Sequence, residues 1–225
     1  MVNRYRERAL EEHLAHDQAL ISLIQSLAFG FLVTIGYGRI TDDPSQAWVI
    51  LLQAFLIMQC IVVIWQEYWY GTVFLKWTLT ISDFWIPFVI GLAEFIMVVA
   101  MGSPLFVFFL ATAFFAFVGS WALHNQLTQS SRTRYRAENG SILHELRQHH
   151  RIAMTGAVAY PLFWLALGAM TYIWHPPIIV LMSLLASNLL VWIHSIMRQR
   201  AFNRVLSLDD FPLEAPASGT STNPH

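Results

Sequence analysis

Six long apolar stretches alternate with short polar segments along the chain. The stretches cover residues 19–38, 47–66, 84–101, 105–123, 152–174 and 178–197. A hydrocarbon core of about 30 Å takes roughly 20 helical residues to cross, and each stretch approaches or exceeds that length. The composition agrees, since 56% of the residues are hydrophobic and only 12% are charged. The pattern predicts an all-α integral membrane protein with six transmembrane helices.

Three very short connections, at residues 42–44, 102–104 and 175–177, each contain proline. Proline is tolerated in the first turn of a helix, where its missing N–H would lack a partner anyway. We therefore expect three antiparallel hairpins. With the amino terminus inside, every Lys and Arg except Arg39 falls on the inner side. Because basic residues collect on the cytoplasmic side of a bilayer, this predicts both termini in the cytoplasm, in a cell (plasma) membrane.

These features divide the chain into five segments. Residues 1–18 form a cytoplasmic amphipathic segment, 19–124 carry helices one to four, 125–151 are a cytoplasmic loop with partial helix, 152–197 carry helices five and six, and 198–225 form a cytoplasmic disordered tail. The tail is rich in Ser, Thr, Pro and acidic residues, which cannot bury enough apolar surface to fold. The lone cysteine excludes an intrachain disulfide and a cysteine-based zinc motif.

One carboxyl group, that of Glu94, lies near the middle of the third stretch. It follows Phe84 by ten residues, which at a rise of 1.5 Å is about 15 Å, half of the hydrocarbon thickness. An ionisable group at that depth costs at least a few kcal/mol, so it is a functional candidate facing protein or water. Asp83 lies three helical turns earlier and shares its face. The two acids indicate an ion pathway.

Polar groups in other stretches lie at similar depth. Gln59, Asn188 and Tyr160 are the neutral partners that we expect beside Glu94, and Gln25 lies somewhat nearer the cytoplasm. We therefore expect a channel or transporter for a small cation or protons. Its partners are the lipid bilayer and the ion, and a homo-oligomer is compatible with the sequence. We expect no cofactor, and nothing beyond ordinary membrane-flanking arginines points to nucleic acid.

Tryptophans mark the inner ends of the three returning helices, in Trp65-Gln66-Glu67-Tyr68, Trp121-Ala122-Leu123-His124 and Trp192-Ile193-His194. Tryptophan favours the headgroup level of a bilayer, so we expect an aromatic belt there. In the first stretch, small residues recur every fourth position at Ser22, Ser26, Gly30 and Thr34. Small residues let helix backbones approach closely. We expect this ridge, and Gly168 in the fifth stretch, to serve helix packing.

Histidines are concentrated on the predicted cytoplasmic side, and they suggest a metal site as an alternative to the ion pathway. The low-ranking candidate metal ligands are His13, His16, Asp17, His144, His149 and His150. Imidazole and carboxylate together suit zinc or iron, and these short pieces resemble a little the histidine boxes of membrane di-iron desaturases and hydroxylases. That resemblance implies a membrane metalloenzyme. A noncatalytic assembly or signalling subunit is the other alternative, and we favour transport over both.

Overall fold

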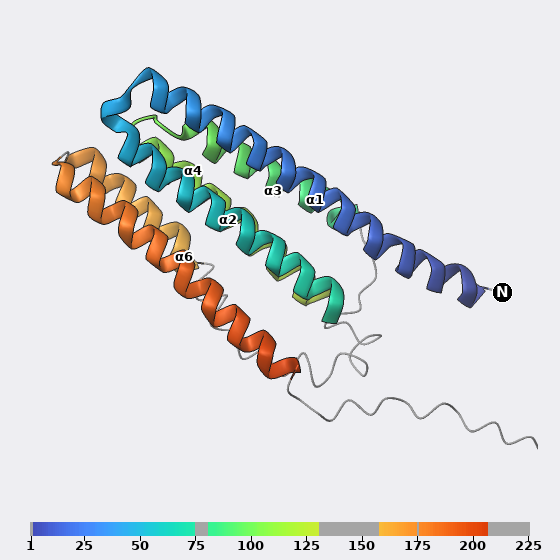
Figure 1. Cartoon of the computed structure of the whole chain (residues 1–225). Helices are drawn as coiled ribbons and strands as arrows, with labels where there is room; N and C mark the ends of the chain where they lie inside the picture. The colour runs from blue at the N-terminus through green and yellow to red at the C-terminus, as the bar shows by residue number, and fades with distance from the viewer. Residues whose placement is uncertain (1, 75–80, 131–157, 175, 207–225) are drawn as a thin grey trace, which may run out of the picture.

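The computed structural model describes residues 2–74, 81–130, 158–174 and 176–206, and within them it is all-helical, without strands. Its labelled elements are α1 (Val2–Asp42), η1 (Pro44–Gln46), α2 (Ala47–Phe74), α3 (Ile81–Ala100), α4 (Leu105–Ser130) and α6 (Pro177–Leu206). A further apolar helix, Val158–Ile173, precedes α6, and we call it the fifth helix. The helices lie roughly side by side as an elongated bundle (Figure 1).

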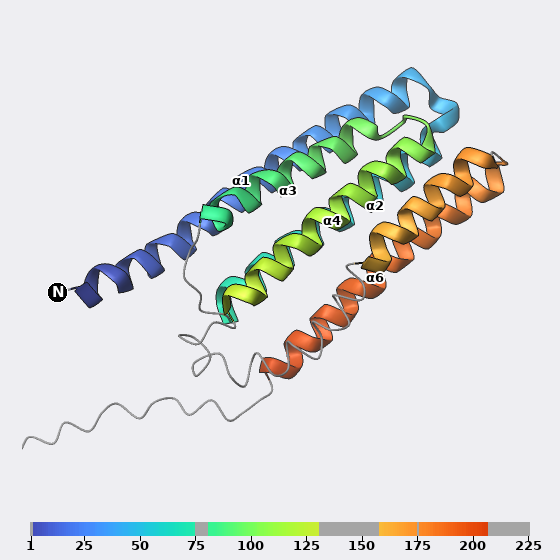
Figure 2. The same ribbon diagram turned by 180° about the vertical axis from the view of Figure 1, so that it is seen from behind.

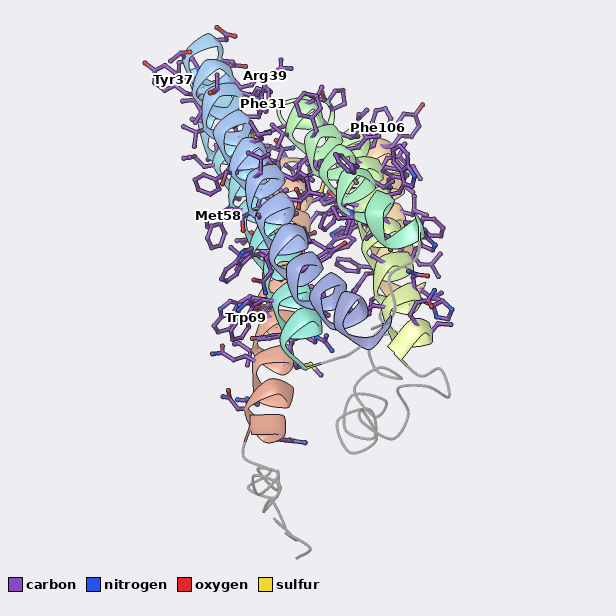
Figure 3. All side chains as sticks on the ribbon, turned by 90° about the vertical axis from the view of Figure 1, so that its right-hand side faces the viewer. Phe31, Tyr37, Arg39, Met58, Trp69 and Phe106 are labelled. Carbon is purple, nitrogen blue, oxygen red and sulfur yellow. The ribbon has the colours of Figure 1, made fainter. Side chains whose placement is uncertain are left out.

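Four helices are long and apolar enough to cross a membrane. They contain the segments Gln18–Asp42, Pro44–Tyr70, Leu105–Gln126 and Pro177–Arg200, while Trp85–Ala100 and Val158–Ile173 are shorter apolar helices. Large apolar side chains cover the outside of the bundle on all six of these helices, and Figure 3 shows Tyr37, Trp69 and Phe106 among them. A soluble monomer rarely exposes so much contiguous apolar surface. Length, composition and surface therefore favour an integral membrane protein.

Each predicted apolar stretch overlaps one helix, but several helices run further than expected. The amino-terminal segment continues without a break into the first stretch as α1, and α4 includes residues 125–130, which were assigned to the loop. Residues 198–206 continue α6 and do not belong to a disordered tail. Residues 125–130 and 198–206 contain no Gly or Pro, and both segments contain Leu and Gln, which are good helix formers. Residues 131–151 and 207–225 lie outside the described residues.

The three proline-containing connections lie between helices, as predicted. In the first, the Asp43 carboxylate caps η1 by accepting a hydrogen bond from the Ser45 amide at 3.1 Å. In the second, Gly102 has a φ of +76° and follows the end of α3. That left-handed conformation suits glycine, which has no Cβ. The Gly102 amide also donates to Gln53 Oε1 of α2 at 3.0 Å, which ties this turn to a second hairpin.

Each helix packs against its neighbours in the bundle. Helix α1 packs against α2 and α3, α3 packs against α4, and α2 packs against α6. The fifth helix closes the gap between α4 and α6: the Phe106 and Tyr172 rings lie 5.2 Å apart, and Trp164 Nε1 donates to Ser187 Oγ at 3.2 Å. Figures 1 and 2 show the start of α1 and the end of α6 toward the same end of the bundle, which we call the terminal end.

Helices α1 and α3 approach closely at Gly91. A Cβ added there would clash with the Ile24 side chain of α1, whereas one added at Gly168 would make ordinary contacts with α4. Gly168 thus lies at the contact with α4, but an added Cβ would fit there, and its role in close packing stays a prediction. The prediction for the α1 ridge is wrong, because Ser22, Ser26, Gly30 and Thr34 all lie on its exposed face. The packed face lies one or two positions earlier and consists of Ile21, Gln25, Ala28 and Leu32.

Replacing Gly91 with Ala should destabilise the bundle by about 1–3 kcal/mol, the usual cost of overpacking a tight contact. Ile24 is β-branched and therefore cannot move aside easily. The matched control is Gly30→Ala, because an added Cβ at Gly30 meets nothing within 4 Å. Thermal unfolding in detergent measures both variants. A Gly91→Ala protein as stable as Gly30→Ala would mean that α1 and α3 are not in close contact at this level.

Candidate functional site

Glu94 is completely buried, with 0% of its surface exposed, in the middle of the bundle. Helix α3 carries it inward beside Ala93 and Met97, which are also fully buried. Its Oε1 atom accepts a hydrogen bond of 2.9 Å from Gln25 Nε2 of α1. The Cys60 thiol of α2 lies within electrostatic range of the carboxyl group. Three helices therefore meet at this one acidic side chain.

The Glu94–Gln25 pair leaves two buried oxygens without a hydrogen bond. Glu94 Oε2 and Gln25 Oε1 have no partner among the described residues. An unsatisfied buried polar group costs about 1–3 kcal/mol. A protonated carboxyl group gains an O–H donor, and an amide oxygen is an acceptor. Protonation of Glu94 would thus let the pair form two reciprocal hydrogen bonds, whereas the ionised form leaves both oxygens unpaired.

The other predicted pathway residues lie at different interfaces. Asn188 of α6 donates to the carbonyls of Leu52 on α2 at 3.3 Å and of Leu184 at 2.8 Å. Gln59 is half-buried on α2, and its Oε1 atom has no partner among the described residues. Within the described ranges, no hydrogen bond joins either side chain to Glu94. Their common role in an ion pathway stays a prediction.

Asp83 and the candidate metal ligands are placed only in part. Asp83 lies in the first turn of α3, on the same continuous helix as Glu94, but its side chain lies outside the described residues. Pro87 cannot donate the helical hydrogen bond to the carbonyl of Asp83. The side chains of His13, His16 and Asp17, and the whole of His144, His149 and His150, also lie outside. Among the described residues, no group of three His, Cys, Asp or Glu side chains is arranged to hold a metal.

Tyr160, the last predicted partner, belongs to a second polar cluster near the terminal end. Its hydroxyl lies 3.0 Å from His194 Nδ1 of α6. The other ring nitrogen, His194 Nε2, lies 3.9 Å from Glu67 Oε1 of α2. Arg198, one turn beyond His194, donates to both oxygens of Glu67. This Tyr160–His194–Glu67–Arg198 cluster, which we call the terminal cluster, joins three helices.

The tryptophan motifs contained a signal for the terminal cluster, although they were interpreted only as an aromatic belt. Trp65 and Trp192 are exposed, as a belt requires. Residues two positions apart on a helix point about 200° apart, so an outward tryptophan places Glu67 and His194 on the inner side. In the remaining motif, His124 follows Trp121 by three residues, a spacing that keeps both side chains on one face of the helix. His124 is indeed exposed.

A cavity of about 140 Å³ lies between the terminal cluster and the level of Glu94. Glu67, Tyr160 and His194 line its terminal end, and Cys60 and Ile90 line it deeper in the bundle. Cys60 and Glu67 are seven residues apart on α2, which corresponds to about 10 Å along the axis. Glu94 follows Ile90 by one helical turn. The terminal cluster thus forms one end of the cavity, and the other end lies one helical turn from Glu94.

Together, the fold and the site define a class: an all-helical protein with helices suited to cross a membrane and an acid buried at their centre. A comparison of the chain with protein-family models, curated proteins and solved structures finds no match. The function must therefore be argued from the residues themselves.

The Glu67–Arg198 ion pair should couple α2 to α6 energetically. Their side chains are only 16% and 13% exposed, so removing one partner leaves a poorly solvated charge. In a double-mutant cycle with Glu67→Ala and Arg198→Ala, we expect a coupling of about 1–3 kcal/mol in the free energy of unfolding. Arg200→Ala, on the exposed side of the same turn, should change stability by less than about 0.5 kcal/mol. Additive effects of the two alanines would show that the pair contributes nothing to helix packing.

Proposed function

We propose that this protein moves protons across a membrane, with Glu94 as the group that binds and releases them. The observation that carries the proposal is a completely buried carboxyl group with one bonded and one unbonded oxygen. Ionisable residues at membrane depth are costly and typically mark ion or proton pathways. A packing role alone would be served at lower cost by an amide or a hydroxyl group.

The surroundings of Glu94 favour a proton over a metal cation. Sodium, potassium and calcium need a cage of several oxygen atoms. The polar group bonded to Glu94 instead presents an amide N–H, from Gln25, and an N–H donor repels a cation. A proton needs only one oxygen and a nearby acceptor, which the unpaired oxygens of the two side chains provide. The Glu94–Gln25 pair is therefore suited to exchange a proton.

The position of the cavity favours proton exchange between Glu94 and the terminal end of the bundle. It extends from Glu67 and His194 to Ile90, one turn short of Glu94. The walls around Cys60 and Ile90 are apolar, so water reaches Glu94 only if the side chains between them move apart. We propose that this movement opens Glu94 to the terminal end. Asp83, whose position on α3 lies toward the same end, is the next acid on the same helix.

The proposed orientation puts both termini in the cytoplasm and the turn at Pro104 outside, because all basic residues except Arg39 would then lie inside. Single cysteines replace Asn3, Pro104 and Ser218 in a protein whose own Cys60 is changed to Ala. In intact cells, we expect a membrane-impermeant thiol reagent to label only the Pro104→Cys protein. Labelling of Ser218→Cys without permeabilisation would refute the six-span arrangement.

Replacing Glu94 with Gln keeps the shape of the side chain and removes its proton-binding group. We expect proton flux in liposomes containing Glu94→Gln protein to fall to that of empty liposomes, with expression and oligomer size nearly unchanged. The measurement is the internal pH after an external pH jump, with a counter-ion carrier present.

The matched control is Ser183→Ala, another buried polar change. Ser183 is 1% exposed on α6 and its hydroxyl has no partner among the described residues, so its loss should leave the flux intact. Flux that persists in Glu94→Gln, or that is absent from the unmodified protein, would refute the proposal.

A further inference from the structure

The cavity beside the terminal cluster has the size of a small-molecule site. Most of its lining is apolar, from residues such as Ile64, Phe115, Trp164 and Val191. An engineered apolar cavity of about 150 Å³ in a helical protein stays dry and binds benzene. The walls of this cavity come from five helices, α2, α3, α4, the fifth helix and α6, and the cavity is partly open. Its volume of about 140 Å³ corresponds to a molecule with one aromatic ring.

One end of the cavity offers both a hydrogen-bond donor and an acceptor. When Tyr160 donates to His194 Nδ1, the neutral imidazole carries its hydrogen on Nε2. That nitrogen lies 3.9 Å from Glu67 Oε1, which is too far for a direct hydrogen bond. Glu67 Oε1 already accepts from Arg198, but a carboxylate oxygen has a second lone pair. The donor and the acceptor are thus separated by a gap that one oxygen atom can bridge.

A hydroxyl group matches this gap, whereas a carbonyl, an ether or an ammonium group does not. An oxygen about 2.8 Å from each atom would accept from His194 Nε2 and donate to Glu67 Oε1. A carbonyl or an ether can accept but cannot donate, and an ammonium group can donate but cannot accept. Water would satisfy the same two atoms, but it would leave the apolar remainder of the cavity unfilled. An apolar body with one hydroxyl group satisfies both parts.

We propose that this cavity is a binding site for a neutral, hydroxyl-bearing apolar molecule about the size of phenol, with its hydroxyl group between His194 and Glu67. The site does not depend on the role of Glu94 in transport. It gives the terminal cluster a recognition role, in which Tyr160 fixes the tautomer of His194 and Arg198 holds Glu67 in position.

The test uses 4-fluorophenol and fluorobenzene as probes of the full-length protein in lipid nanodiscs, observed by fluorine NMR. We expect saturable binding of 4-fluorophenol above the background of empty nanodiscs. Ala116 lines the cavity, and Ala116→Leu should abolish this binding by filling the space. The matched control is Phe117→Leu, on the lipid-facing side of the same helix, which should bind normally. No saturable binding, or unchanged binding in a folded Ala116→Leu protein, would overturn the proposal.

The role of the hydroxyl group has a separate test. His194→Phe keeps an aromatic ring and removes both nitrogens, so it should weaken 4-fluorophenol binding by about tenfold, the loss of one or two hydrogen bonds. Binding of fluorobenzene should change little. If both probes weaken equally, or if neither does, the hydroxyl group does not lie between His194 and Glu67. Proton flux is not measured in these experiments, so their failure is distinct from failure of the transport proposal.

Discussion

Helices in a hydrocarbon environment gain little from burying apolar side chains against one another, because lipid is as apolar as the helix surface. Their arrangement then depends on close packing and on the few polar contacts between them. In this protein several of the described interfaces have such a contact. Gln25–Glu94 joins α1 to α3, Glu67–Arg198 joins α2 to α6, and Tyr160–His194 joins the fifth helix to α6. Gln53 joins α2 to the turn at Gly102.

The Glu94 site and the terminal cluster differ in how many of their carboxyl oxygens are hydrogen-bonded. In the terminal cluster, Arg198 donates to both oxygens of Glu67, which stabilises the carboxylate. At Glu94, a single amide donor meets a fully buried carboxyl group and two oxygens are left unpaired. The first arrangement is suited to hold a charge in place. The second has no satisfied ionised form in the described structure, so it is suited to take up and release a proton.

The positions of the polar side chains show which features the sequence pattern could predict and which it could not. Glu94 was found from its depth alone, since position along an apolar helix fixes depth in a bilayer. Its partner Gln25 was seen only as a polar residue nearer the cytoplasm. Gln59, Asn188 and Tyr160 were predicted at similar depth, yet Asn188 bonds to α2 and Tyr160 lies in the terminal cluster. Depth does not determine which way a side chain points around the helix axis, and the small-residue ridge of α1 was misjudged for the same reason.

The sequence by itself determined the helical architecture and its connections. Long apolar segments specify helices suited to a membrane, because a single segment in hydrocarbon can pair its own backbone N–H and C=O groups only as a helix. Proline and glycine mark where those helices begin and end. Only the tertiary structure decided which faces meet. The rotation of each helix depends on contacts between residues far apart in the chain, such as Ile24 with Gly91 and Arg198 with Glu67. The buried pair, the terminal cluster and the cavity between them all arise from that choice of faces.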